Sequence, residues 1–349
     1  MPTDVDVAVS LRIEAWPAVD LALSLAPVVH RPAQRSLETG RAWRLRAEAA
    51  GFVPAIEPFG KEVWINILGL CLDHESARSA NGFLDTLDGL TPQEVLRYLT
   101  GFYRRVFRRE TPAAVMDAAI RGDRAARLEF RRTSFPDVPE QRTTLRHLLS
   151  APASDVAGEF RTLLRRWHDE VFVADAASLE SEANADVRAL RRWSEGRPAE
   201  AVVEHACPGI TYVPEVGQTD VVLAPSVLVR PSYAILDHRS ANLFAYPATA
   251  GTRSTAPPER LVTLARAVGD VTRLRILREL ADEPMGPGDL AERLTMPRTT
   301  LLHHLSILRQ ANLIGLQVHD SAYHTYVVRD EHLGDIGRLL GDYLRTEEG

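Results

Sequence analysis

The feature of this sequence that most constrains its fold is a pair of helical patterns joined by a very short connection near the C-terminus. Residues 289–294 form a short helical pattern, and residues 295–297 lead into a longer one that reads RTTLLHHLSILRQANL. On the longer helix Leu301, Leu305 and Leu308 fall on one face at about 100° per residue, which predicts a buried stripe. Two helices joined this closely are typical of a helix-turn-helix.

The opposite face of the longer helix carries side chains that suit the reading of base edges in DNA. Arg298 lies at the N-terminal end, where a recognition helix usually reaches the bases. The arc opposite the leucines holds Thr299, His303, Ser306 and Gln310, which are compact and can form hydrogen bonds, and Arg298 and Thr300 flank this arc. We expect DNA contacts from Arg298, Thr299, Thr300, His303, Ser306 and Gln310. His304 is expected at the flank of the core instead.

A predicted hairpin and a last helix follow. The runs LQVH and YHTYVV, separated by a turn at 320–321, predict an antiparallel pair that serves as a wing. His319, Ser321 and His324 are expected to make weak DNA contacts, because the tip has no Arg or Lys. Residues 330–345 predict a helix whose apolar stripe is wide for so small a domain. We therefore expect it to pair with a second copy of the chain.

Taken in order, ARAVGDVTRLRILREL, DLAERL, TTLLHHLSILRQANLI and a wing that ends at Tyr326 resemble the ArsR-type winged helix-turn-helix transcriptional regulator family. The resemblance covers residues 257–349 only. It implies a homodimer formed through the terminal helices, and repression of transcription that an inducer relieves. A two-fold dimer predicts a double-stranded DNA operator that is an inverted repeat.

The metal sites of that family are not matched here. Its first site needs cysteines on the helix before the turn, where this chain reads MGPGDLAE. Its second site begins with Asp-x-His, which Asp330 and His332 fit, but Tyr343 and Thr346 hold the partner positions and are not zinc ligands. We interpret the first pair as an aspartate cap with an exposed histidine. We expect no metal and no cofactor, and an effector that is not a metal.

The composition limits how the chain can bind DNA. A net charge of -6 excludes binding through bulk positive charge, so any DNA contact must be local. The basic residues are arginines with the single exception of Lys61, a bias that genomic composition explains. Cys71 and Cys207 lie far apart, and we interpret them as buried structural thiols.

The sequence also bears on location. It holds no run approaching the about 20 apolar residues that span a bilayer, and its first residues have no basic segment followed by an apolar one. We therefore expect a cytoplasmic protein that has no membrane partner.

The first domain is expected over 1–250 and the winged helix-turn-helix over 257–349, with a linker at 248–258 rich in Pro, Gly, Ser and Thr. The pattern predicts an α+β fold, mostly helical with a small antiparallel sheet. An opening strand over 5–13 precedes a long helical middle, and short β-branched and aromatic runs fill 209–247. The apolar segment 62–72 is left open between helix and strand.

The first domain carries no motif that would make it an enzyme. We find no phosphate loop, nucleophile elbow, metalloprotease helix or paired ligands, so no catalytic residue is proposed. We expect a sensor or interaction domain, and an enzyme or a structural domain fused to a DNA-binding domain remains the alternative. Aromatic and charged residues within 209–247 are the make-up of a ligand site, while the core of a small sheet is the explanation that strand composition favours. These residues are Tyr212, Tyr233, Phe244, Tyr246, Arg230, Asp237, His238 and Arg239.

Overall fold

The computed structural model describes residues 9–134, 139–207, 210–214, 218–249, 259–318, 324–329 and 334–345. They divide into two compact units. The sheet unit is Ala8–Glu195 with Gly217–Gly251, and the C-terminal unit is Thr252–Gly349 with Gly196–Val216. The segment Gly196–Val216, expected in the first domain, therefore groups with the C-terminal unit.

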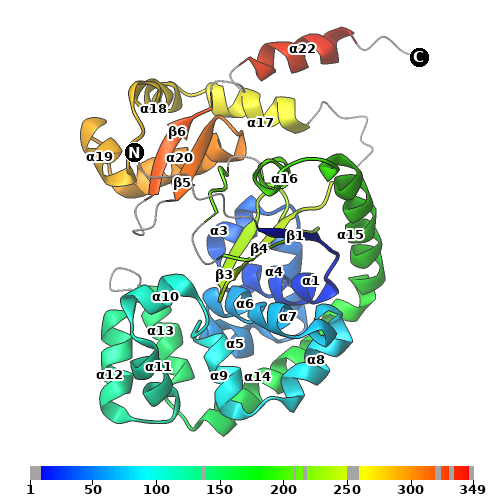
Figure 1. The fold of residues 1–349 in the computed structure, drawn as a ribbon, viewed down its shortest axis with the longest axis vertical. Helices are drawn as coiled ribbons and strands as arrows, with labels where there is room; N and C mark the ends of the chain where they lie inside the picture. The colour runs from blue at the N-terminus through cyan, green and yellow to red at the C-terminus, as the bar shows by residue number, and fades with distance from the viewer. Residues whose placement is uncertain are drawn as a thin grey trace. The chain divides into compact units, whose positions relative to one another are not determined.

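The sheet unit is built on four strands, β1 Ser10–Ile13, β2 Asp220–Ser226, β3 Ala234–His238 and β4 Ala241–Pro247. Their order is β1-β2-β4-β3 (Figure 1). β1 runs parallel to β2, and β2 runs parallel to β4 in a register that places Leu223 beside Phe244. Only β3 is antiparallel to its neighbour β4. The prediction of an antiparallel sheet is therefore wrong, because three of the four strands are parallel.

Two of the runs read as strands in 209–247 do not join this sheet. Residues 210–213, which read ITYV, contribute only Ile210, in an isolated bridge. Residues 227–232 form turns and bends. The central strand β2 instead takes β1 as one neighbour, which lies more than half the chain away. Local sequence patterns mark extended segments, but the direction of a strand depends on a partner that they do not identify.

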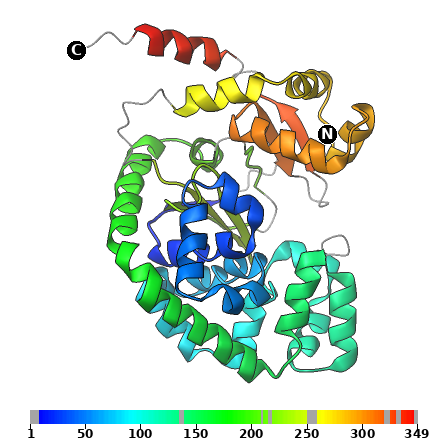
Figure 2. The ribbon, with the colours of Figure 1, turned by 180° about the vertical axis from the view of Figure 1, so that it is seen from behind.

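Helices dominate the rest of the sheet unit among the described residues, with 3₁₀ turns at η1 and η2 and a π-helical turn at η3 (Figures 1 and 2). The segment left open at 62–72 is helical, as α6 and α7. The elements are α1 Pro17–Leu23, α2 Ala26–Val29, α3 Arg31–Ser36, α4 Gly40–Ala49, α5 Val53–Ile56, η1 Glu57–Phe59, α6 Glu62–Asn66, α7 Gly69–Asp73, η2 Glu75–Arg78, α8 Ala80–Gly89, α9 Pro92–Leu99, α10 Arg105–Glu110, α11 Ala113–Ile120, α12 Arg124–Thr133, α13 Pro139–Leu148, α14 Ala153–Trp167, η3 His168–Phe172 and α15 Val173–Ser194.

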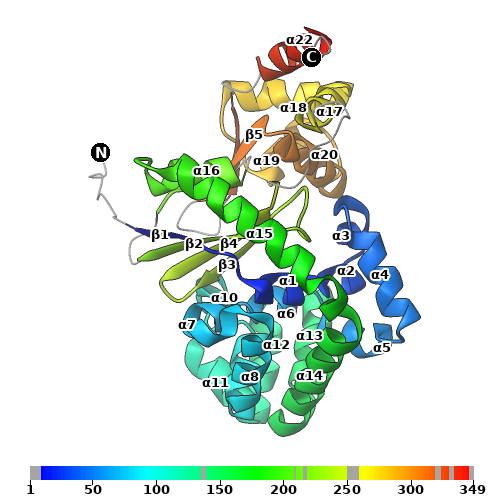
Figure 3. The same cartoon turned by 90° about the vertical axis from the view of Figure 1, so that its right-hand side faces the viewer.

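The core of the sheet unit is aromatic. Trp167 is fully buried, its ring meets Phe52 edge-on at 5.4 Å between centroids, and its indole nitrogen donates to Ser24 Oγ at 2.8 Å. Figure 3 shows α1, α6 and α7 on one side of the sheet. α1 packs against β2, and α6 and α7 pack against β3, so the core joins helices from the start of the unit to strands from its end.

The C-terminal unit contains α16 Ala199–Ala206, α17 Glu259–Val268, α18 Val271–Asp282, α19 Pro287–Arg293, α20 Arg298–Gln310, β5 Ile314–Val318, β6 His324–Val328 and α22 Asp335–Arg345. Its core confirms the predicted stripe of α20, since Leu301, Leu305 and Leu308 are at most 1% exposed. β5 and β6 pair as an antiparallel hairpin directly after α20. In the part of the chain that the structure describes, no helix has both the length and the apolar character needed to cross a membrane.

Candidate nucleic-acid interface

A tight turn fixes α20 against α19. The Thr295 amide donates to Glu292 O at 3.0 Å, and the Met296 amide donates to Ala291 O at 3.0 Å. Thr295 has φ 51°, a left-handed conformation that reverses the chain within one residue. Pro297 then precedes the first turn of α20, where the missing amide hydrogen costs nothing. The short connection holds the two helices in a helix-turn-helix arrangement.

The face of α20 opposite its buried stripe is open to solvent. All six residues predicted on this helix are exposed: Arg298, Thr299, Thr300, His303, Ser306 and Gln310. Leu302 lies among them and is 42% exposed. His304 is only 15% exposed and its Nδ1 lies 4.0 Å from Asp270 Oδ1, so it sits at the flank of the core, as predicted. The structure thus leaves all six predicted residues of α20 accessible, with Arg298 and Thr300 at the edges of the face that the other four share.

The side chains of the three hairpin residues predicted to contact DNA lie outside the described part of the structure. His319 and Ser321 lie outside the described residues. His324 begins β6, and its side chain lies outside the described part. Their predicted DNA contacts remain predictions.

The arginine side chains near this interface differ in whether they already bind other residues of the chain. Arg273 donates to Ala267 O at 2.8 Å and to Arg266 O at 2.7 Å, so its guanidinium caps the C-terminal end of α17. Arg293 is paired with Glu283 at 2.9 Å. The side chain of Arg298 makes no hydrogen bond or ion pair with any residue that the structure describes. Arg298 therefore offers an uncommitted positive charge at the N-terminal end of α20.

A buried arginine ties the hairpin to residues upstream of the linker. Arg329 follows β6 and is only 7% exposed. Its guanidinium donates to Asn312 Oδ1 at 2.9 Å, to Ile210 O at 3.2 Å and to Thr211 Oγ1 at 3.2 Å, and lies 3.5 Å from Glu204 Oε2. We call residues 199–207 and 210–214 the strap, because they hold Arg329 from a distant part of the chain.

The strap also contacts the edge of β5. Ile210 forms a parallel bridge with Leu316. Gly315 leaves room for this contact, since a Cβ there would lie 3.2 Å from Thr211 Oγ1 and 3.4 Å from Arg329 Nε. Sequence reasoning missed the strap, because Arg329 and Thr211 are 118 residues apart and no local pattern links them.

The residues predicted to form a ligand site in 209–247 are largely committed to packing. Tyr212, Phe244 and Tyr246 are at most 7% exposed. Asp237 accepts hydrogen bonds from Arg104 Nε at 2.8 Å and from the Val106 amide at 2.9 Å. These contacts favour the aromatic core that the sequence left open as the other explanation.

The predicted half of a metal site lies outside the described residues, since neither Asp330 nor His332 is among them. Within the described ranges, no group of three or more His, Cys, Asp or Glu side chains is arranged to hold a metal ion.

The geometry of α19 and α20 defines a helix-turn-helix protein, and comparison with known proteins identifies its family. The profile described as "Bacterial regulatory protein, arsR family" matches residues 270–315. The HTH-type transcriptional regulator CmtR of Mycobacterium tuberculosis is 36% identical over 86 residues, which are 25% of this chain and 70% of CmtR. This chain belongs to the ArsR family, through its C-terminal unit.

Other relatives match the same part of the chain. The uncharacterized HTH-type transcriptional regulator MJ1325 of Methanocaldococcus jannaschii is 29% identical over 24% of this chain and 94% of its own length. The transcriptional repressor SdpR of Bacillus subtilis is 41% identical over 14% of this chain and 56% of its own length. The crystal structure of NolR from Sinorhizobium fredii aligns with 26% of this chain and 97% of that chain at 28% identity and a TM-score of 0.21, too low to bear on the fold.

Proposed function

We propose that this protein is a sequence-specific, DNA-binding transcriptional regulator whose α20 enters the major groove. The observation that carries the proposal is the exposed polar face of α20 on a helix-turn-helix of the ArsR family. Arg298 begins this face and has its guanidinium uncommitted among the described residues. A bidentate contact from arginine to guanine is the commonest specific contact in that groove.

We further propose that the β5–β6 hairpin is a wing and that the protein acts as a homodimer. Supporting the dimer, an apolar depression between α17 and α22 is lined by Leu261, Val262, Ala265, Ile336 and Leu340, the last 45% exposed. A two-fold dimer would present two α20 helices to an operator that is an inverted repeat. Light scattering at micromolar concentration distinguishes a dimer from a monomer.

The direction of regulation and the role of the sheet unit belong to the same proposal. We take the protein to be a repressor, because a relative of its C-terminal unit is named a transcriptional repressor. We take its effector not to be a metal, because the sequence does not match the metal sites of the family. We take the sheet unit to be a sensor that catalyses no reaction.

Replacing Arg298 tests the proposed DNA contact. In the full-length protein, Arg298→Ala should weaken binding to the specific operator by about 1 to 3 kcal/mol and weaken binding to random DNA less. The operator can be obtained by selection from random duplexes, and both affinities measured by fluorescence anisotropy at one salt concentration. Arg278→Ala is the matched control, because Arg278 is exposed on α18 and its loss changes the net charge equally. Equal losses on specific and random DNA would reduce Arg298 to a phosphate contact.

A further inference from the structure

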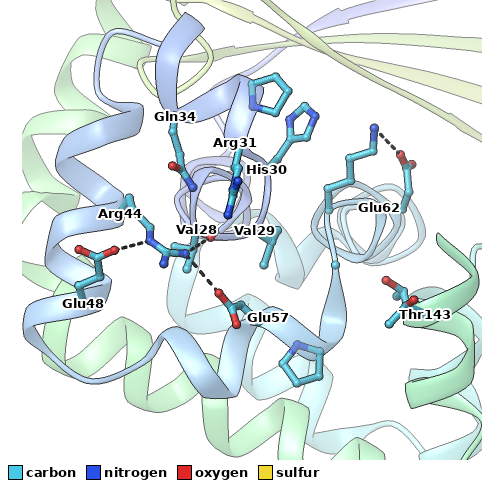
Figure 4. Close-up of a pocket in the computed structure, with 15 residues that line it drawn as sticks. Val28, Val29, His30, Arg31, Gln34, Arg44, Glu48, Glu57, Glu62 and Thr143 are labelled. Carbon is cyan, nitrogen blue, oxygen red and sulfur yellow. Dashed lines mark hydrogen bonds and ion pairs between the residues drawn. The ribbon is translucent and has the colours of Figure 1, made fainter. Parts of the chain in front are cut away.

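A cavity in the sheet unit has the size and the lining of a small-molecule site. Its volume is about 650 Å³, within the range of ligand pockets. Figure 4 shows Arg31, Gln34 and Arg44 directed toward one side of it, with Glu62 and Thr143 on the other. The walls come from α2, α3, α4, η1, α6 and α13. Apolar contact surface is supplied by Val28, Val29, Pro32 and Pro58.

The carboxylates of this cavity are already engaged. Arg44 binds Glu48 at 2.7 Å and lies 3.6 Å from Glu57, and it also donates to Val28 O at 2.5 Å. Glu62 Oε2 accepts from Arg104 at 3.2 Å. Because these acceptors have cationic partners from the protein, the wall does not need a cation from a ligand.

Donors, by contrast, remain available. Arg31 is exposed, and neither its guanidinium nor the side-chain amide of Gln34 makes a hydrogen bond or ion pair with another described residue. Lys61 Nζ forms an ion pair with Glu62 Oε1 at 3.8 Å, and the other oxygen of that carboxylate already accepts from Arg104. With its carboxylates engaged and with Arg31 and the side chain of Gln34 open, the cavity is complementary to an anion.

We propose that this cavity binds a small organic anion, a carboxylate or a phosphate ester, and that this anion is an effector of DNA binding. Arg31 offers a planar pair of donors to the anionic group, Lys61 offers a point charge, and Gln34 adds a neutral donor. Val28, Val29 and Pro58 contact the apolar part of the ligand. The regulatory half rests on the proposed function, because an effector acts only if it binds the DNA-free and DNA-bound forms unequally.

Lys61 allows a direct measurement of binding. It is the only lysine in the chain, so an acylating reagent modifies no other side-chain amine, and the N-terminal amine is resolved by peptide mass spectrometry. The full-length protein is acylated with and without inorganic phosphate or citrate, at constant ionic strength. A probe at several times its Kd should slow acylation of Lys61 by about fivefold. Protection by phosphate alone indicates a phosphate ester, and protection by citrate alone indicates a carboxylate.

Two variants make the test specific. Arg31→Gln should abolish the protection of Lys61, whereas Arg35→Gln should retain it, because Arg35 lies on the same helix but does not line the cavity. An unchanged acylation rate with both probes overturns the anion site. Equal protection in both variants overturns the assignment of Arg31.

The regulatory half has its own readout. The protecting probe should change the affinity for the selected operator in the unmodified protein but not in Arg31→Gln. Protection without a change in DNA affinity overturns the effector role and leaves the binding site standing. A protein that binds no DNA at all would refute the proposed function, while the acylation result would still decide the site.

Discussion

The two units of this protein are specified by their sequences in different ways. In the C-terminal unit, elements that follow one another along the chain also pack together, and α17 to α20 form one core with the hairpin. In the sheet unit, β1 lies beside β2 although more than half the chain separates them. The contrast teaches that short-range periodicity suffices where the fold is built from neighbouring elements. It fails where strand partners come from the two ends of a unit.

The comparison predicts that the two units can be destabilised separately, and Trp167 offers the largest effect. Trp167→Ala removes a fully buried ring and its hydrogen bond to Ser24, which should cost the sheet unit about 3 to 5 kcal/mol. All 5 tryptophans of the chain lie in the sheet unit, so fluorescence during urea unfolding reports on that unit alone. Leu128→Ala is the control, since Leu128 is 63% exposed.

Operator binding by the Trp167→Ala protein tests whether the two units unfold independently. If the C-terminal unit folds on its own local pattern, specific DNA affinity should survive at urea concentrations that unfold the sheet unit. Simultaneous loss of the fluorescence signal and of operator binding would mean that the units fold as one.

A smaller effect is a pH dependence of the stability of the sheet unit, which arises from the buried carboxyl of Asp20. Burial raises the pKa of Asp20 to about 6 from an ordinary 3.8, despite a hydrogen bond from Ser226 Oγ at 2.5 Å. Folding therefore favours the protonated carboxyl, and this stabilisation is complete below pH 3.8 and is lost as the pH rises through about 6. Its size is about 3 kcal/mol, at about 1.4 kcal/mol per pKa unit. Urea unfolding followed by tryptophan fluorescence should lose this contribution between pH 4 and pH 7, and Asp20→Asn should not.

The pKa of Asp73 is shifted in the opposite direction to that of Asp20. Burial alone would raise its pKa, but His238, whose Nε2 lies 3.0 Å from Asp73 Oδ2, and a hydrogen bond from the Tyr98 hydroxyl outweigh burial and hold the pKa at about 2. Its contribution is therefore present above pH 3.8 and is lost as the pH falls through about 2. Asp73→Asn should destabilise the sheet unit at neutral pH. If Asp20→Asn also destabilises the sheet unit at neutral pH, the loss of stability between pH 4 and pH 7 does not come from ionisation of the Asp20 carboxyl.

The smallest effect asks whether the C-terminal unit is as self-contained as its sequence suggests. Arg329→Met leaves the acceptors of the strap without their donor, which should destabilise the β5–β6 hairpin by about 1 to 3 kcal/mol. Hydrogen exchange of the β5 amides in the full-length protein measures this directly. Glu200→Gln, on the strap one turn before Glu204, should change the exchange by less than about 0.5 kcal/mol.

The exchange result also decides how the unit should be isolated. Unchanged exchange in Arg329→Met would show that residues 257–349 need no strap. A faster exchange would mean that a truncated domain must retain Gly196–Val216 to be folded as in the full chain.

The sequence by itself determined the helix-turn-helix. The spacing of Leu301, Leu305 and Leu308 fixes which face of α20 is buried, and so which residues are exposed for DNA. The pattern Thr91-Pro92-x-Glu94 likewise marks a helix start within a few residues. In the structure the Thr91 hydroxyl accepts from the Glu94 amide at 3.3 Å in a complete capping box. Helical periodicity and capping depend on residues within a few positions of one another, which a single sequence displays in full.

Only the tertiary structure decided the parallel sheet, the strap and the cavity. Thr111 shows the limit on a small scale, because a threonine before a proline is typical of a helix cap. Its hydroxyl instead bonds Thr133 and Ser134, more than twenty positions away. Arg329 and Lys61 gain their roles in the same way, from partners that the chain brings together by folding. A contact across a long loop is chosen by how well distant surfaces fit, and that fit leaves no periodic trace in the sequence.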